Sequence, residues 1–158
     1  LGEKMIALYP ASAAVYYWYL VNLGSWSEIY GILAAAKEGV ANTMQEYAKN
    51  IIDIDSTYSD GGGYFMLGAV HLKSPYIPFI LSWPSDEKAL KYLLLAYNTG
   101  DATPSQTVYL ARAFYTNDQK EKAISLLTSL LGQDISESYK LEDIDQHKIA
   151  KEQLNDWK

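Results

Sequence analysis

The segment Ala89-x3-Leu93-x2-Ala96 decides the fold, because its pattern returns 34 residues later as Ala123-x3-Leu127-x2-Leu130. In both segments, small or apolar residues recur three and four positions apart, which is the spacing of one face of a helix. A fixed period of this length is typical of proteins built from stacked pairs of helices. The sequence therefore predicts an all-α fold with internal repetition.

A period of 34 residues is that of the tetratricopeptide repeat, a helix–turn–helix unit with the pattern W-x2-L-G-x2-Y followed by A-x3-F. The first half of that pattern appears in relaxed form as Tyr64-x2-Leu67-Gly68-x2-His71 and again as Thr107-x2-Leu110-Ala111-x2-Phe114. We therefore expect tetratricopeptide-repeat-like stacked helical hairpins (an α-solenoid) that form one domain over residues 1–158.

Start and stop signals divide the chain into expected helices. Gly24 followed by Ser25 predicts a turn between two helices, which would make a first hairpin from 11–23 and 25–36. Further helices are expected at 38–52, about 64–72, 86–98, 104–116, 119–131 and about 141–156.

The polar run 53–63 predicts a loop, and it ends in three consecutive glycines. These glycines indicate a close approach of two backbones, or else a phosphate-binding loop before a helix. Nearby aspartates would repel phosphate, which favours the first interpretation. Asp53, Asp55 and Asp60 have part of the spacing of a calcium loop, but the glycine and glutamate of that motif are missing, so we expect a solvated loop.

A proline-rich insertion interrupts the repeat between Lys73 and Asp86. Gly68 and Ala111 lie 43 residues apart, nine more than one period. The extra residues include Pro75, Pro78 and Pro84, which exclude a regular helix, together with several large apolar side chains. We expect this segment to fold back over the helices on a binding face.

The composition excludes several classes of function. Net charge is −6, with 13 basic and 19 acidic residues, which disfavours nucleic acid and anionic membrane surfaces. The chain has no cysteine and two histidines, so disulfides, thiolate sites and histidine-rich metal sites are not expected. We find no motif that pairs a nucleophile with a base, and we expect neither a catalytic residue, a metal nor a cofactor.

The aromatic content points instead to binding, with 14 Tyr and 4 Trp against 3 Phe. Tyr and Trp suit interfaces and grooves, although helix packing also uses them. Four consecutive aromatics, Tyr16 to Tyr19, cannot all face one core, so at least one should line a groove or an interface. His71 occupies a repeat position that favours a buried, hydrogen-bonded side chain, or alternatively a polar group in a groove. The expected binding residues are Tyr17, Trp18, Trp26, Tyr64, His71, Tyr76 and Trp83.

Several short motifs, in order, resemble one family over residues 9 to 131. They are Tyr9-Pro10-x-Ser12, Tyr17-Trp18, Leu23-Gly24-x-Trp26, Tyr58-x2-Gly61-Gly62, Leu67-Gly68 and Pro75-x2-Pro78. Together they resemble the T-component of tripartite ATP-independent periplasmic (TRAP) transporter systems. The chain departs from the family at Tyr64-Phe65-Met66, where a basic residue is usual, and at Lys151-Glu152-Gln153.

The resemblance implies a non-enzymatic, all-α protein that is exported to the periplasm and lipid-anchored through a segment absent from this sequence. It implies a periplasmic solute-binding protein as the partner and assembly into a homo-oligomer. The aromatic surplus and the proline-rich insertion add the expectation of a small organic ligand. The alternative is a cytoplasmic tetratricopeptide-like adaptor that binds peptides. An export signal at the start of the full-length protein would distinguish the two.

Overall fold

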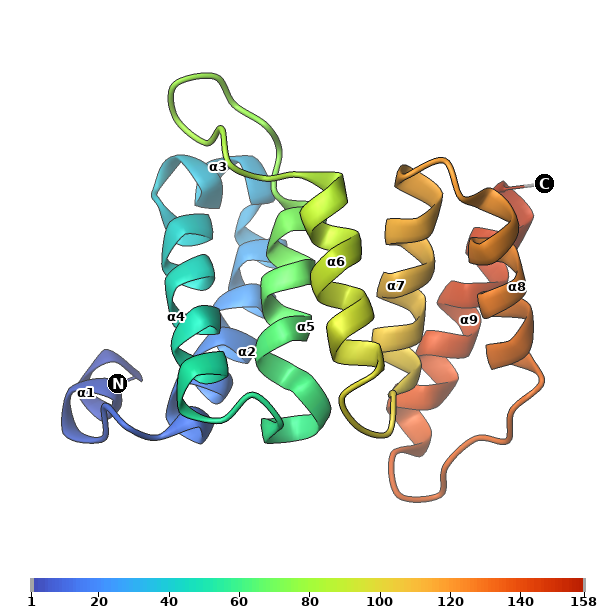
Figure 1. Cartoon of the computed structure of the whole chain (residues 1–158), viewed down its shortest axis with the longest axis horizontal. Helices are drawn as coiled ribbons and strands as arrows, with labels where there is room; N and C mark the ends of the chain where they lie inside the picture. Colours follow the sequence, from blue (N-terminus) through green and yellow to red (C-terminus); the bar gives the residue numbers. More distant parts are fainter. Residues whose placement is uncertain (1, 158) are drawn as a thin grey trace.

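A computed structural model describes residues 2–157, which fold into helices joined by non-helical connections (Figure 1). In this range the only extended pairing is an isolated bridge between Ile77 and Leu81. The helices are α1 (Gly2–Leu8), α2 (Ala13–Tyr30), α3 (Ile32–Lys37), α4 (Val40–Ile54), α5 (Tyr58–Lys73), α6 (Asp86–Tyr97), α7 (Pro104–Thr116), α8 (Lys120–Leu131) and α9 (Lys140–Asp156). The predicted all-α class is therefore confirmed.

Helices that follow one another along the chain also pack against one another. From α4 to α9 every consecutive pair is in contact, and the most extensive contact joins α5 to α6. Figure 1 shows α5, α6 and α7 side by side. α2 packs mainly on α4, and α7 contacts α9 as well as α8. Each inner helix is thus covered by its neighbours in sequence.

The repeated segment occupies equivalent positions in α6 and α8. Ala89, Leu93 and Ala96 are the fourth, eighth and eleventh residues of α6, and all three are buried. Ala123, Leu127 and Leu130 hold the same three positions in α8 and are also buried. The 34-residue spacing therefore arises because α6 and α8 place the same three positions in the core.

Local signals place these later helices accurately. The Ser85 side chain accepts a hydrogen bond from the Lys88 backbone at the start of α6. Thr103 and Gln106 form a reciprocal capping box ahead of α7, with Pro104 at its first position. These side chains satisfy backbone N–H groups that have no partner within the helix. Observed and expected bounds agree within about two residues here, the ordinary uncertainty of helix ends.

The expected first hairpin is wrong. α2 continues through Gly24 and Ser25 to Tyr30, so no turn separates 11–23 from 25–36. A glycine within a helix costs about 1 kcal/mol, which burial along the same helix readily offsets. The break comes instead at Gly31, whose φ of 110° is accessible to glycine and not to larger residues. α2 is therefore one long helix that packs on α4.

The expected loop at 53–63 is much shorter in the structure. α4 extends to Ile54 and α5 begins at Tyr58, with a left-handed kink at Ser59, Asp60 and Gly61. All three consecutive glycines are buried. A Cβ on Gly61 would lie 3.1 Å from the Cα of Ala96, so the prediction of a close approach of two backbones is confirmed.

The segment 74–85, which we call the finger, folds back only in part. Its two arms pair through backbone hydrogen bonds of 2.8 Å in both directions between Ile77 and Leu81, and Leu81 is buried in the core. The tip points away, and Phe79 there is fully exposed. In Figure 1 the finger is the yellow-green loop that extends past the ends of α5 and α6, at the same end of the molecule as α3.

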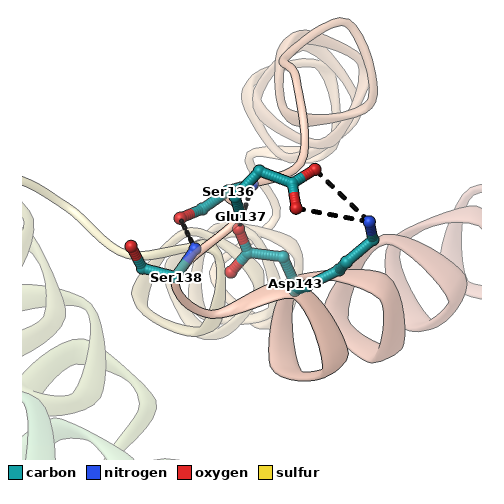
Figure 2. Close-up of polar contacts among 5 residues, drawn as sticks. Ser136, Glu137, Ser138 and Asp143 are labelled. Carbon is teal, nitrogen blue, oxygen red and sulfur yellow. Dashed lines mark hydrogen bonds and ion pairs between the residues drawn. The ribbon is translucent and has the colours of Figure 1, made fainter.

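The connection into α9 is held by polar contacts (Figure 2). The buried carboxylate of Asp143 accepts a hydrogen bond of 3.0 Å from the backbone N–H of Ser136. Lys140 forms an exposed ion pair with Glu137 at 3.3 Å. The charged, weakly periodic C-terminal segment is thus a helix, as predicted. Over residues 2–157, none of the helices has the length and apolarity to cross a bilayer.

Two glycine substitutions test these helix contacts. Gly68→Ala would bring a Cβ within 2.6 Å of Leu93 Cγ and 3.0 Å of its backbone nitrogen, so we expect a loss of about 1–3 kcal/mol in the free energy of unfolding. Gly24→Ala meets only Met44 Cε at 3.6 Å and should stabilise the protein by about 0.5–1 kcal/mol. Urea denaturation followed by circular dichroism measures both. A destabilising Gly24→Ala would contradict the continuous α2.

Candidate functional site

A cavity of about 420 Å³ lies among α2, α3, α4 and α5. It exists because many of the side chains that face it are small, so the helices do not fill the space between them. These small residues are Gly24, Ala35, Ala36, Ala41 and Ala69. The remaining wall is largely apolar and includes Leu20, Val21, Val40, Met44, Met66 and Val70. Volume and lining are those of a small-molecule pocket.

The polar part of the lining centres on Lys73, at the end of α5. Its ammonium forms an ion pair with Glu28 of α2 and lies 5.0 Å from the ring centre of Tyr109 on α7. Burial by itself would lower the pKa of Lys73, but Tyr109 and Glu28 more than offset this and raise the pKa above its ordinary value. Lys73 is therefore charged and already paired.

The lining also extends to the C-terminal helices. Ser105 and Tyr109 of α7 and Glu142 of α9 line the same cavity. The Tyr109 ring makes an edge-on contact with Phe65, with the ring centres 5.1 Å apart. The Arg112 guanidinium lies 5.6 Å from the centre of the Tyr109 ring and also holds it in place. The cavity is thus built from residues more than 100 positions apart in sequence.

Two of the expected binding residues, Tyr17 and Trp18, line this cavity. Their rings are in edge-on contact at 5.5 Å, and Tyr17 makes a second such contact with Tyr58. Trp18 is 59% exposed. The inference that not all four consecutive aromatics face the core is confirmed, because Tyr16 is buried while Trp18 is not.

Trp18 and Trp26 meet at a second hollow, of about 630 Å³, between α1 and α2. Met5, Val15 and Leu23 are also part of this hollow. Trp26 stacks on Tyr30 with the ring centres 4.4 Å apart, and both rings are exposed. One face of α2 therefore presents aromatic side chains outward, which we call the outer α2 patch (Trp18, Trp26 and Tyr30).

The buried His71 pairs with the half-buried Trp83, and neither lines the two hollows above. Their rings are edge-on at 4.9 Å, and His71 also stacks on Tyr92 at 5.8 Å. Trp83 Nε1 donates a hydrogen bond of 2.7 Å to Asn42 Oδ1. The contacts of Trp83 fasten the base of the finger to α4 and α5.

The buried histidine of the sequence analysis is present, but it is not fully hydrogen-bonded. His71 is 3% exposed, and its Nδ1 has no hydrogen-bond partner among the described residues. Burial, followed by the charges of Lys88 and Lys49, lowers the pKa of His71 to about 4. A neutral, buried imidazole packs here much as a phenyl ring would.

Tyr64 and Tyr76 line neither of the two hollows. Tyr64 is half-buried on α5, whereas Tyr76 is exposed on the finger. Beside Tyr76 the finger exposes Phe79 and Ile80, which the sequence analysis did not single out. An uncharged run of twelve residues, 74–85, was the signal that could have drawn attention to them.

Other residues missed from the sequence are Glu28, Lys73 and Tyr109, which belong to the polar part of the cavity lining. They lie on three different helices and share no motif, so only their packing brings them together. In residues 2–157, no cluster of three or more histidines and acids could hold a metal. Asp55 serves the local turn, where its Oδ1 accepts hydrogen bonds from the backbone N–H and the hydroxyl of Thr57.

No protein-family model matches this chain, and no curated protein matches it in sequence.

The buried imidazole makes stability depend on pH. An unfolded histidine titrates near 6.5 and the folded His71 near 4, so the unfolded state binds the extra proton first. The free energy of unfolding should fall as pH drops from about 6.5 to about 4, by up to ~3 kcal/mol. We expect His71→Phe to remove this loss, because a phenyl ring can fill the same position and does not titrate.

Urea denaturation at pH 7, 5.5 and 4.5 measures the effect, with His147→Gln on α9 as the matched control. His147→Gln should keep the acid sensitivity of the parent. If His71→Phe loses stability on acidification as steeply as the parent does, another group is responsible.

Proposed function

We propose that this protein is a non-enzymatic helical scaffold of a periplasmic TRAP-type transport system. In this proposal the finger docks a solute-binding protein, and the cavity among α2 to α5 shelters a small organic ligand. The observation that carries the proposal is the finger, an uncharged aromatic projection on a rigidly held base. The sequence motifs between residues 9 and 131 support the choice of transport system.

We further propose that α5 with α6, and α7 with α8, are tetratricopeptide-like hairpins. In support, the buried Ala-Leu pattern lies at the same three positions of α6 and α8. Gly68 in α5 is in close contact with Leu93, and Ala111 in α7 belongs to one core cluster with Ala123. Small residues at these crossings allow each hairpin to close tightly.

The base of the finger is fixed, which favours a docking role over a loose loop. Leu81 is buried, and Trp83 is held by Asn42 and His71. A preorganised element loses little conformational entropy on binding. Large aromatic side chains that enter a partner's pocket supply much of the affinity of an interface.

The backbone at the tip also favours function over stability. Phe79 has a φ of 65°, a region that bulky residues rarely adopt and that costs about 1–3 kcal/mol. Its side chain makes no compensating contact, because it is fully exposed. A glycine would fit this conformation better, so the presence of phenylalanine suggests that the side chain contributes to binding.

Location and anchoring follow the same proposal. A lipid-anchored periplasmic protein fits the family resemblance, and fractionation of cells that express the full-length gene tests it. Recovery in the cytoplasm would favour the peptide-binding adaptor instead, with the outer α2 patch and the finger as its contact surfaces.

Phe79→Gly separates docking from folding. We expect it to weaken binding of the purified solute-binding protein at least tenfold, which corresponds to about 1.4 kcal/mol, because it removes the projecting ring. Its free energy of unfolding should remain within about 1 kcal/mol of the parent or rise, since glycine relieves the strain at φ 65°. Surface plasmon resonance and urea denaturation measure the two quantities.

The matched control is Leu141→Ala. This substitution also removes a strongly exposed apolar side chain, but from α9 instead of the finger. It should leave the affinity within about twofold of the parent. Parent-like affinity in Phe79→Gly would remove the finger from the docking surface. Trp83→Ala should weaken binding as well, but with a loss of stability, because this ring packs against the core.

A further inference from the structure

The charges around the cavity indicate which kind of ligand it accepts. Its lining contains three formally charged side chains, namely Glu28, Lys73 and Glu142. Lys73 and Glu28 neutralise each other as an ion pair. Glu142 has no ion-pair partner among residues 2–157, so the balance of the lining is one negative charge.

The rest of the molecule reinforces this sign. The chain carries a net charge of −6, so its overall field attracts cations and repels anions. An anionic group that approached Lys73 would be repelled by Glu28, which is already paired with Lys73. It would also be repelled by Glu142 in the same cavity. A carboxylate is therefore poorly matched to this lining.

Aromatic rings in the lining add a second preference for cations. The faces of Trp and Tyr rings attract ammonium groups. Tyr109 is already in contact with Lys73 and Arg112, but Tyr17 and Trp18 have no lysine or arginine over their rings in the described part of the chain. Trp18 is also largely exposed, so an entering group can reach its ring.

The apolar part of the cavity requires an apolar body on the same ligand. Most of the wall is aliphatic, and burying such a surface against a hydrocarbon contributes about 25 cal/mol per Å². A volume of about 420 Å³ is within the range of ligand sites. A small hydrophilic cation would leave this aliphatic wall in contact with water, so burial of the wall would contribute little to its affinity.

We propose that the cavity among α2 to α5 binds an amphiphile that has an apolar body and a cationic amine or quaternary ammonium head. The apolar body lies against the aliphatic wall, and the head lies near Glu142 and the rings of Tyr17 and Trp18. This inference rests on the ligand-sheltering part of the proposed function and does not depend on the finger or on the transport system.

Three amphiphiles of equal chain length test the head group on the whole 158-residue chain. Isothermal titration calorimetry compares decyltrimethylammonium, decanol and decanoate below the concentrations at which they form micelles. We expect saturable binding of one decyltrimethylammonium per chain, at least tenfold tighter than decanoate. Equal or tighter binding of decanoate would overturn the cationic preference, and absence of binding by all three would overturn the ligand class.

Paired variants on α9 locate the head group. Glu142→Gln should weaken the binding of decyltrimethylammonium about three- to tenfold and leave the affinity for decanol unchanged. Glu152→Gln removes an exposed acid of the same helix that does not line the cavity, and it should leave all three affinities unchanged. Equal losses in the two variants would show a general attraction to an acidic surface and would overturn the proposed site.

The outcome is separable from that of the docking experiment. Binding of the solute-binding protein is measured without any amphiphile present, and Phe79 lies outside the cavity lining. If Phe79→Gly abolishes docking while no amphiphile binds, the scaffold proposal holds and the ligand inference fails. If amphiphile binding follows Glu142 while docking is unaffected by Phe79, the ligand inference holds and the docking role of the finger fails.

Discussion

Close approach of helices at residues that lack bulk is the constraint on which the structure depends. α5 lies between α4 and α6, and its glycines face both neighbours. A Cβ on Gly63 would lie 2.9 Å from Ile51 of α4, and one on Gly61 would lie 3.1 Å from the Ala96 Cα of α6. Because these contacts join backbone to backbone or to buried side chains, they leave no room for a larger residue. They fix the distances between these helices, and the other contacts between the helices depend on those distances.

The same use of small residues has the opposite consequence at the other end of the bundle. Among α2, α3, α4 and α5, several of the residues that face the space between the helices are alanines, and a cavity remains. Packing this loose reduces stability, because each lost contact and each void costs free energy. A ligand that occupies the cavity would restore those contacts. The Lys73–Glu28 ion pair and Tyr109 provide the polar side of the lining.

The finger combines a buried base with a tip that extends away from the protein. Its base is part of the core, through Leu81 and the contact of Trp83 with His71, whereas its tip departs from the protein at Phe79. Within the described part of the chain, His71 Nδ1 has no hydrogen-bond partner, which is a cost that the packing of two neighbouring rings offsets. The finger therefore has a fixed base and an exposed tip with a strained backbone, which is the basis of the docking role that we propose for it.

From the sequence alone, the helical class, the bounds of α6 to α9 and the equivalence of the segments at Ala89 and Ala123 could be determined, because periodicity and caps are local signals. The close approach at Gly61 to Gly63 and the burial of His71 also followed from local pattern.

The continuity of α2 through Gly24 could not be determined in this way, since the cost of one interior glycine is small and only the packing on α4 decides whether a helix ends there. The cavity, the pairing of Lys73 with Glu28 and the outward direction of Phe79 were likewise decided by tertiary structure. Each depends on helices that are distant in sequence meeting at a particular distance, and no spacing of residues along the chain encodes that distance directly.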